Sequence, residues 1–221
     1  MKKISLTLAP GAHLGVGLMS GTSHDGISAA LAEIDERKRP SARVLAFHSY
    51  HYEPEFQARL LEASAGADVG AQRISSLNFE LGNAFGRAAT ELLKASRISA
   101  RRISFIGSHG HTFAHVPPRR GKPGAGSGFS PSTLQLGETA LIAAITRIPV
   151  VADFRPMDIA LGGQGAPLAP LAHIWFFADP KRGRIIQNIG GIGNATWLGP
   201  ARSRERIRPV AFDTGPGVML I

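Results

Sequence analysis

The sequence of 221 residues contains no cysteine. Disulfide-stabilised folds, zinc sites with thiolate ligands, iron–sulfur clusters and cysteine nucleophiles are therefore excluded. Tryptophan and tyrosine occur only twice each, so we do not expect a platform of aromatic side chains on which nucleobases could stack. A chain without cysteine is compatible with a reducing compartment, and we expect a cytoplasmic protein.

Long apolar runs are also missing. No stretch approaches the roughly 18 uninterrupted apolar residues that a membrane-spanning helix needs. The apolar N-terminal stretch is interrupted by Pro10, Gly11 and His13, which argues against a signal peptide. We therefore expect neither export nor membrane insertion.

Acidic residues are scarce relative to basic ones, with 16 Asp and Glu against 25 Lys and Arg and a formal net charge of +9. The basic residues stand in separate clusters beside predicted turns, and no aromatic residues are interleaved with them. This distribution favours solvated loop charges, or a preference for anionic small molecules, over a nucleic-acid partner.

Glycine and proline are plentiful, at 26 and 15 residues, and indicate many tight turns between short elements. The patterns predict strands at 13–20, 27–34, 42–52, 102–106 and 149–154, helices at 54–65, 71–96, 137–146 and 168–178, a loop at 117–130 and a hairpin at 183–198. The helix over 71–96 has apolar residues spaced by three and four. The predicted order is three strands, then alternating helices and strands, and then two new strands that could begin a repeat of the first three. This order predicts a duplicated α/β architecture with a boundary near 179–183.

Residues 19–26, MSGTSHDG, form the first candidate site. Between two strands, the backbone N–H groups and the hydroxyls of Ser20, Thr22 and Ser23 could surround an anion, and Asp25 could hold the water shell of a metal. Side chains at Gly21 or Gly26 would obstruct the close approach of such an anion. The segment is not a Walker A loop, and an ordinary polar hairpin turn is the alternative.

Residues 108–112, SHGHT, are the second candidate. His109 and His111 are separated by one residue at a predicted strand end. There they could ligate a metal together with Asp153 or Asp213. The result would be a metal hydrolase. The alternative is that these histidines form hydrogen bonds to a ligand or to the backbone.

The third candidate combines residues 151–156, VADFRP, with the glycine-rich segment 162–167. In an extended chain Asp153 and Arg155 would share one face. An arginine in this place can bind a carboxylate in bidentate fashion. A purely structural Asp153–Arg155 ion pair is the alternative.

Two glycine turns near the C-terminus are the fourth candidate. Gly190 and Gly191 stand at the turn of the predicted hairpin, which resembles a second phosphate-cradling turn. Asp213, in the FDTGPG segment, is expected at a strand end, where a carboxylate can act as a general base. A helix N-cap is the alternative for Asp213.

Taken in order, MSGTSHDG, SHGHT, VVADFRPMDIALGGQGAPLAP, NIGGIGNAT and FDTGPG resemble the anhydro-N-acetylmuramic acid kinase family of the actin/hexokinase/Hsp70-type ATPases. The resemblance runs from about Leu14 to the last residue. It implies a ribonuclease H-like α/β fold with duplicated actin/hexokinase-type lobes. The first lobe would comprise residues 1–180, and residues 181–221 would form the start of a truncated second lobe.

By this resemblance the protein uses Mg-ATP and water to open the ring of 1,6-anhydro-N-acetylmuramic acid and phosphorylates O6. The cofactors are then ATP and Mg²⁺, and the product, N-acetylmuramic acid 6-phosphate, belongs to peptidoglycan recycling. The rival interpretation is a non-catalytic sugar- or phosphate-binding remnant of the same family. Whether two copies form a homodimer is left open.

The resemblance also assigns roles to residues. The nucleotide phosphates are assigned to Gly21, Thr22, Ser23, His24, Asp25, Gly26, Ile27 and Ser28. The sugar is assigned to Ser108, His109, Asp153 and Arg155, and the catalytic base to Asp213. The chain departs from the family pattern at Ser28, His111 and Val218, where aspartate, glutamine and asparagine are usual.

Overall fold

The structure is a computed structural model that describes residues 11–21, 23–35, 41–65, 69–118, 130–200 and 207–217. Thr22, Val218 and most of the predicted loop at 117–130 lie outside the described residues. The strands are β1 (Ala12–Ser20), β2 (Gly26–Asp35), β3 (Ser41–His51), β4 (Ile103–Val116), β5 (Ser132–Leu136), β6 (Val150–Val151), β7 (Arg184–Ile189), β8 (Ile192–Leu198) and β9 (Val210–Pro216). The helices are α1 (Pro54–Ser64), α2 (Ala71–Ala95), α3 (Thr139–Thr146), α4 (Phe154–Ala160) and α5 (Ala169–Phe177), with a short 3-10 turn, η1, at Ala100–Arg102.

The larger sheet has the strand order β3-β2-β1-β4-β5, and β6 pairs with β4. β1, β2 and β3 form an antiparallel meander, whereas β4 runs parallel to β1 and β6 runs parallel to β4. In the ribonuclease H-like arrangement, the first strand of such a meander also pairs with a parallel strand, as β1 does with β4. The expected α/β fold class is confirmed.

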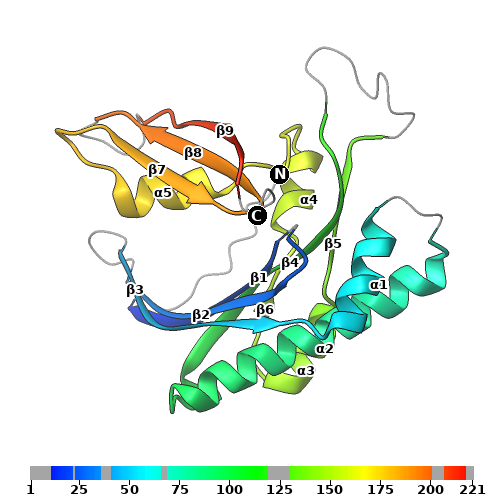
Figure 1. Ribbon diagram of the computed structural model, residues 1–221. Helices are drawn as coiled ribbons and strands as arrows, with labels where there is room; N and C mark the ends of the chain where they lie inside the picture. The colour runs from blue at the N-terminus through cyan, green and yellow to red at the C-terminus, as the bar shows by residue number, and fades with distance from the viewer. Residues whose placement is uncertain are drawn as a thin grey trace.

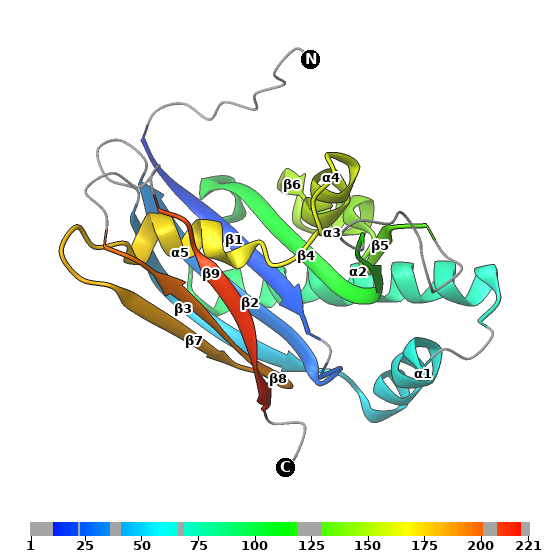
Figure 2. The same cartoon turned by 90° about the horizontal axis from the view of Figure 1, so that it is seen from above.

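One face of this sheet is covered by α2, which lies beside α3 (Figure 1). The apolar stripe predicted along 71–96 forms the centre of the core: Leu77, Leu81, Phe85, Ala88 and Leu92 are all buried. They pack against residues of β1 and β2 such as Val16 and Leu31. The view from above shows α2 crossing beneath the strands (Figure 2).

The structure differs from the sequence prediction at three elements. β4 does not end at residue 106 but continues to Val116, because Gly110 takes up φ 73° and lets pairing resume beyond an irregularity. The short strand β5 was not predicted. The strand expected at 149–154 ends at Val151, and α4 begins at Phe154 with Pro156 in its first turn, where a missing N–H costs little.

The predicted hairpin at 183–198 is confirmed as β7 and β8, and β9 extends it to a second three-stranded sheet. Like β1–β3, this sheet is an antiparallel meander. It lies on the opposite side of the larger sheet from α2, and α5 contacts both β3 and β8 (Figure 1).

The second sheet has a much smaller core, formed by Ala178, Leu198 and Ile207. Many large apolar side chains here remain exposed, for example Ile185 at 70% and Ile189 at 71%. Further exposed apolar side chains on α5 and β7–β9 are Leu171, Trp175, Phe177, Ile192, Trp197, Val210 and Phe212. Residues from α5 onward therefore bury their apolar surface incompletely.

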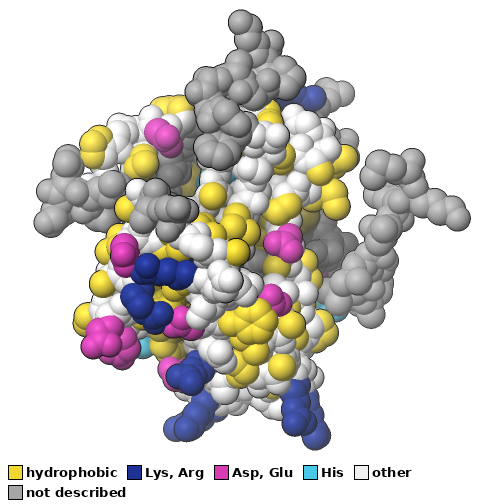
Figure 3. All heavy atoms as spheres, turned by 90° about the vertical axis from the view of Figure 1, so that its right-hand side faces the viewer, with side chains coloured by type: hydrophobic (Ala, Val, Ile, Leu, Met, Phe, Trp, Pro, Cys, Tyr) yellow, Lys and Arg dark blue, Asp and Glu magenta, His cyan; other side chains and the backbone are white. Residues whose placement is uncertain are grey.

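Some charged side chains on the described helices form ion pairs between α1 and α2. Arg59 binds Glu80 and Arg73 binds Glu62 across α1 and α2, and the face that carries these helices shows both signs interspersed (Figure 3). Among the described residues, no helix is long and apolar enough to cross a membrane.

Candidate functional site

The segment at residues 21–26 connects β1 to β2 at the carboxyl end of β1, and we refer to it as the β1–β2 turn. Because β4 runs parallel to β1, its pairing register places Ser108 beside Leu18 and His111 beside Ser20. Two of the predicted segments, 19–26 and 108–112, are thereby brought together. Ligands of open α/β sheets bind at this end of the strands.

The turn is closed by its own backbone. His24 has φ 54°, and its N–H donates to the carbonyl of Gly21 at 3.2 Å. The Ser23 hydroxyl donates to Oδ1 of Asp25 at 2.6 Å, and both side chains are exposed. Apart from its chain neighbours, the one described residue that a Cβ added to Gly21 would meet is Ser23, with its nearest atom at 3.6 Å. The described residues therefore leave room beside Gly21 for a bound phosphate.

The residues after the turn differ in what they can contact. Ile27 is 3% exposed and belongs to the main core, so its side chain cannot reach a ligand at the turn. Ser28 lies exposed on β2, where it pairs with Met19 and Ser49. The exposed carboxylate of Asp25 is the kind of oxygen ligand that Mg²⁺ prefers, so the turn fits a magnesium-bound phosphate.

His109 and Arg155 form a direct pair. Nε of Arg155 donates to Nε2 of His109 at 2.9 Å, and Nδ1 of His109 lies 3.2 Å from the carbonyl of Gly110. Burial, together with the charge of Arg155, lowers the pKa of His109 and keeps the ring neutral. The neutral ring therefore donates through Nδ1 and accepts at Nε2. His109 holds Arg155 through Nε. The terminal nitrogens of the guanidinium can then bind an anion.

This pair corrects the predicted contact between Asp153 and Arg155. Asp153 has φ 57° and directly precedes α4, so the two residues do not share the face of a strand. Asp153 instead lines a groove of about 420 Å³ together with Asn78 and Glu138. Asn78 holds this groove in shape, because its side chain accepts from the N–H of Gly137 at 2.7 Å and donates to Glu138 at 3.1 Å.

Ser108 is 1% exposed, and within the described ranges its hydroxyl has no hydrogen-bond partner. A buried hydroxyl of this kind can bind a ligand or a water molecule. The geometry does not support the metal alternative, since Nε2 of His109 is occupied by Arg155. Within the same ranges, no three His, Asp or Glu side chains gather to hold a metal ion.

The second sheet carries the remaining predicted residues. Gly190 and Gly191 form the turn between β7 and β8, and the N–H of Gly217 donates to the carbonyl of Gly191 at 2.8 Å. Asp213 is exposed in the middle of β9, opposite Asn194, rather than at a strand end or a helix N-cap. The structure therefore places Asp213 on the same sheet as the Gly190–Gly191 turn and on a different sheet from the β1–β2 turn.

Two residues of this region, Tyr52 and Asp158, were missed by sequence reasoning. The Tyr52 hydroxyl donates to Oγ of Ser20 beneath the β1–β2 turn, across 32 positions of sequence. Asp158 accepts from the N–H of Gly165 at 2.7 Å and so holds the glycine-rich segment against α4. Only Asp158 had a local signal, since an aspartate close to a glycine-rich loop often binds its backbone.

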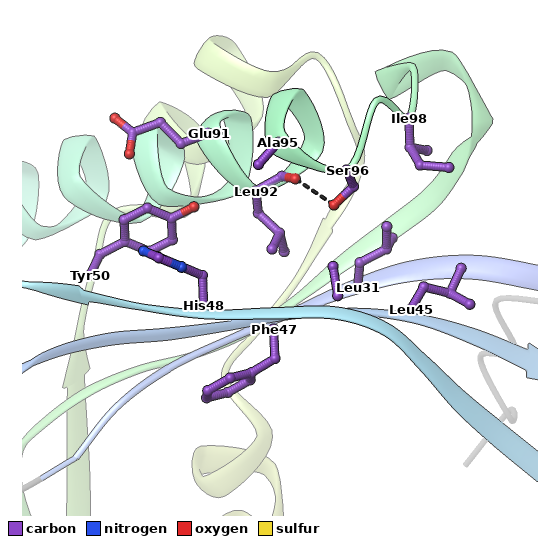
Figure 4. A pocket seen from close by; sticks show the side chains of 11 residues that line it. Leu31, Leu45, Phe47, His48, Tyr50, Glu91, Leu92, Ala95, Ser96 and Ile98 are labelled. Carbon is purple, nitrogen blue, oxygen red and sulfur yellow. Dashed lines mark hydrogen bonds between the residues drawn. The ribbon is translucent and has the colours of Figure 1, made fainter.

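A further groove, of about 550 Å³, lies between β3 and α2 (Figure 4). His48 and Tyr50 point toward the helix, whereas Phe47 points to the other face of the sheet. Burial and the nearby Glu91 raise the pKa of Tyr50. None of the predicted site residues lines this groove, which is separate from the candidate site.

A sequence model of the family described as anhydro-N-acetylmuramic acid kinase matches residues 13–221. The chain is 41% identical over 206 residues to the anhydro-N-acetylmuramic acid kinase of Bacillus cereus strain Q1, and 41% identical over 207 residues to that of Bacillus thuringiensis subsp. konkukian strain 97-27. Both alignments cover 93% of this chain and 52% of the relative. The chain thus spans about half the length of the curated relatives it matches.

Solved structures resemble the chain more distantly. A reductive activator for corrinoid, iron–sulfur protein aligns with 93% of this chain and 31% of its own, at 14% identity and a TM-score of 0.42. A hexokinase from Schistosoma mansoni in complex with glucose aligns with 86% of this chain and 36% of its own, at 12% identity and a TM-score of 0.30.

Proposed function

Because the chain belongs to the anhydro-N-acetylmuramic acid kinase family, we propose that it serves the ATP-dependent conversion of 1,6-anhydro-N-acetylmuramic acid to N-acetylmuramic acid 6-phosphate. Water opens the anhydro bridge at C1, and O6 receives the phosphoryl group. The reaction returns cell-wall amino sugar to metabolism in the cytoplasm. The observation that carries this proposal is the family match over residues 13–221, a range that includes every candidate site residue.

The β1–β2 turn is the proposed site of the nucleotide phosphates. Its open backbone at Gly21 and the exposed Ser23 hydroxyl support this role, and Asp25 would hold Mg²⁺ through its carboxylate. When bound, the magnesium ion supplies positive charge that stabilises the phosphoryl group during transfer. The backbone of the turn orients the phosphates, and Gly190 and Gly191 would contact the nucleotide from the second sheet.

The His109–Arg155 pair is the proposed site of the sugar. Muramic acid carries a carboxylate, and a guanidinium held at Nε by His109 is suited to bind it in bidentate fashion. The buried hydroxyl of Ser108, which has no hydrogen-bond partner among the described residues, is a further candidate to bind a polar group of the ring. Asp153 would contact the sugar from its groove beside Glu138.

Asp213 is the proposed general base. Ordinary glycosidases need a second carboxyl group to protonate the leaving oxygen. Here the leaving O6 is captured by the phosphoryl group, so one carboxylate suffices to take the proton of the attacking water. Asp213 is exposed and can accept that proton.

We further propose that residues 1–180 belong to a first lobe and residues 181–221 to the beginning of a second. The separate sheet of β7–β9 supports this division. The small core of that sheet favours, as the second candidate, a non-catalytic sugar- or phosphate-binding remnant. The two candidates differ in whether the 221-residue chain turns over substrate.

The test is to incubate the 221-residue chain with Mg-ATP and the anhydro sugar and to measure the 6-phosphate product by mass spectrometry. The kinase proposal expects product, and expects Asp213→Asn to lower the rate by about 10²–10⁴-fold. Glu62→Gln, which removes a carboxylate of an exposed ion pair on α1, is the matched control and should leave the rate unchanged. Sugar binding without any product would instead establish the remnant.

A further inference from the structure

A buried hydrogen-bond chain lies directly beneath the β1–β2 turn. The Tyr52 hydroxyl donates to Oγ of Ser20 at 2.9 Å, and this Oγ lies 3.0 Å from Nδ1 of His111. Ser20 is 1% exposed and His111 is fully buried. The three residues come from the end of β1, from the position after β3 and from β4, so the chain joins three segments at one edge of the sheet.

The hydrogen-bond chain holds the ring of His111 through Nδ1. Tyr52 donates to Oγ of Ser20, and the contact between this Oγ and Nδ1 of His111 can run in either direction, because a serine hydroxyl has one hydrogen and two lone pairs. Burial, with smaller effects of His24 and His109, lowers the pKa of His111 to about 4. Burial raises the pKa of Tyr52 to about 12. Near neutral pH, Tyr52 therefore keeps its hydroxyl hydrogen and the ring of His111 is neutral.

The same residues contact the turn at its beginning, its middle and its end. Ser20 is the residue directly before it. The ring of His111 packs against the ring of His24, with centroids 4.8 Å apart in an edge-to-face arrangement. The N–H of Tyr52 donates to the carbonyl of Asp25 at 3.2 Å. A rearrangement of this cluster would therefore move the backbone of the turn.

We propose that Tyr52 and His111 are positioning residues for the β1–β2 turn: acting through Ser20, they set the orientation of the backbone groups that the turn presents to phosphate. Neither side chain touches the ligand itself. The inference rests on the proposed function of the turn as a phosphate site. It adds two residues, 59 positions apart in the numbering, that no local motif of the sequence connects.

The experiment compares Tyr52→Phe, His111→Gln and His111→Leu in the full 221-residue chain. Glutamine keeps an acceptor and a donor at the end of the side chain, whereas leucine has neither. Tyr50→Phe is the matched control, because it removes a tyrosine hydroxyl of β3 that lies in the groove of Figure 4 instead of beneath the turn. Nitrogen chemical shifts of labelled histidine report the tautomer of His111. Backbone amide resonances of residues 23–26 report the turn, and titration with Mg-ATP reports affinity.

We expect His111 of the wild type to be a neutral ring that is hydrogen-bonded to Ser20 through Nδ1. In Tyr52→Phe, Ser20 loses the hydrogen bond from Tyr52, so its contact with Nδ1 of His111 changes and both the ring-nitrogen shifts of His111 and the amide resonances of the turn move. Loss of one such hydrogen bond weakens Mg-ATP binding by about fivefold in Tyr52→Phe and His111→Leu. His111→Gln and Tyr50→Phe should retain the affinity of the wild type.

Two results would overturn the proposal. One is a Tyr52→Phe protein whose His111 ring-nitrogen shifts and turn resonances equal those of the wild type. The other is His111→Gln binding Mg-ATP as weakly as His111→Leu. If instead the ring-nitrogen shifts and the turn resonances move while the wild type binds no Mg-ATP, the positioning role holds and the proposed phosphate-binding function fails.

Discussion

Gly26, the last residue of the β1–β2 turn, allows a prediction with a magnitude worked from the structure. A Cβ at this position would lie 2.1 Å from the carbonyl oxygen of Tyr50 and 2.9 Å from Cα of His51. Non-bonded heavy atoms settle at about 3.5 Å or more. Gly26→Ala must therefore push the ends of β2 and β3 apart by about 1.4 Å where Gly26 pairs with His51.

This displacement has two energetic consequences. It weakens one or two hydrogen bonds at the end of the strand pair, including that from Tyr52 to the carbonyl of Asp25, at about 1 kcal/mol each. It also places an L-residue at φ 158°, where backbone strain costs about 1–3 kcal/mol. The free energy of unfolding should fall by about 3 kcal/mol, which lowers Tm by about 6–12 °C in a chain of this size.

The assay is thermal unfolding followed by circular dichroism, with Gly21→Val and Gly17→Ala measured beside Gly26→Ala. Apart from chain neighbours, a Cβ at Gly17 meets no described atom within 4 Å, and one at Gly21 meets Ser23 at ordinary contact distance. Both should keep Tm within about 2 °C of the wild type, since they fall among neutral surface substitutions. Gly21→Val should nevertheless weaken Mg-ATP binding, because its side chain fills the open space in front of the turn. A Gly26→Ala protein as stable as the wild type would refute the close approach of β2 and β3.

Three further predictions concern other parts of the molecule. The pKa of His111 lies at about 4 in the fold against about 6.5 when unfolded, so its contribution to stability is complete above about pH 6.5 and is lost as pH falls toward 4. Urea unfolding at pH 7 and pH 4.5 should show a loss of about 2–3 kcal/mol that is missing in His111→Gln. Arg155→Met should raise the pKa of His109, because a neighbouring positive charge is removed; an unchanged histidine titration by NMR would contradict the pair. The double variant Ile185→Ser, Ile189→Ser should reduce self-association in analytical ultracentrifugation, since both side chains are largely exposed and apolar; equal self-association would mean that other surfaces drive it.

Local patterns predicted most of the fold. Apolar spacing in 71–96 identified α2 and five of its buried contacts with the sheet, and the glycine turn between β7 and β8 was recognised from composition. β5 was missed because STLQL is short and polar, and its pairing with β4 decides its conformation. Asp153 was misjudged because a left-handed backbone at a single residue ended the strand and began α4. The sequence carries no strong signal for such a change.

What the sequence by itself determined is the set of segments, their order and the family to which they belong, because periodicity, turn chemistry and ordered motifs are properties of neighbouring residues. Only the tertiary structure decided which side chains meet. Ser20 and His111 are 91 positions apart, and His109 and Arg155 are 46 apart. Their contacts depend on β4 pairing parallel with both β1 and β6. Strand order and register are set by the packing of the whole sheet, so no local pattern could reveal that Arg155 would bind His109 instead of Asp153.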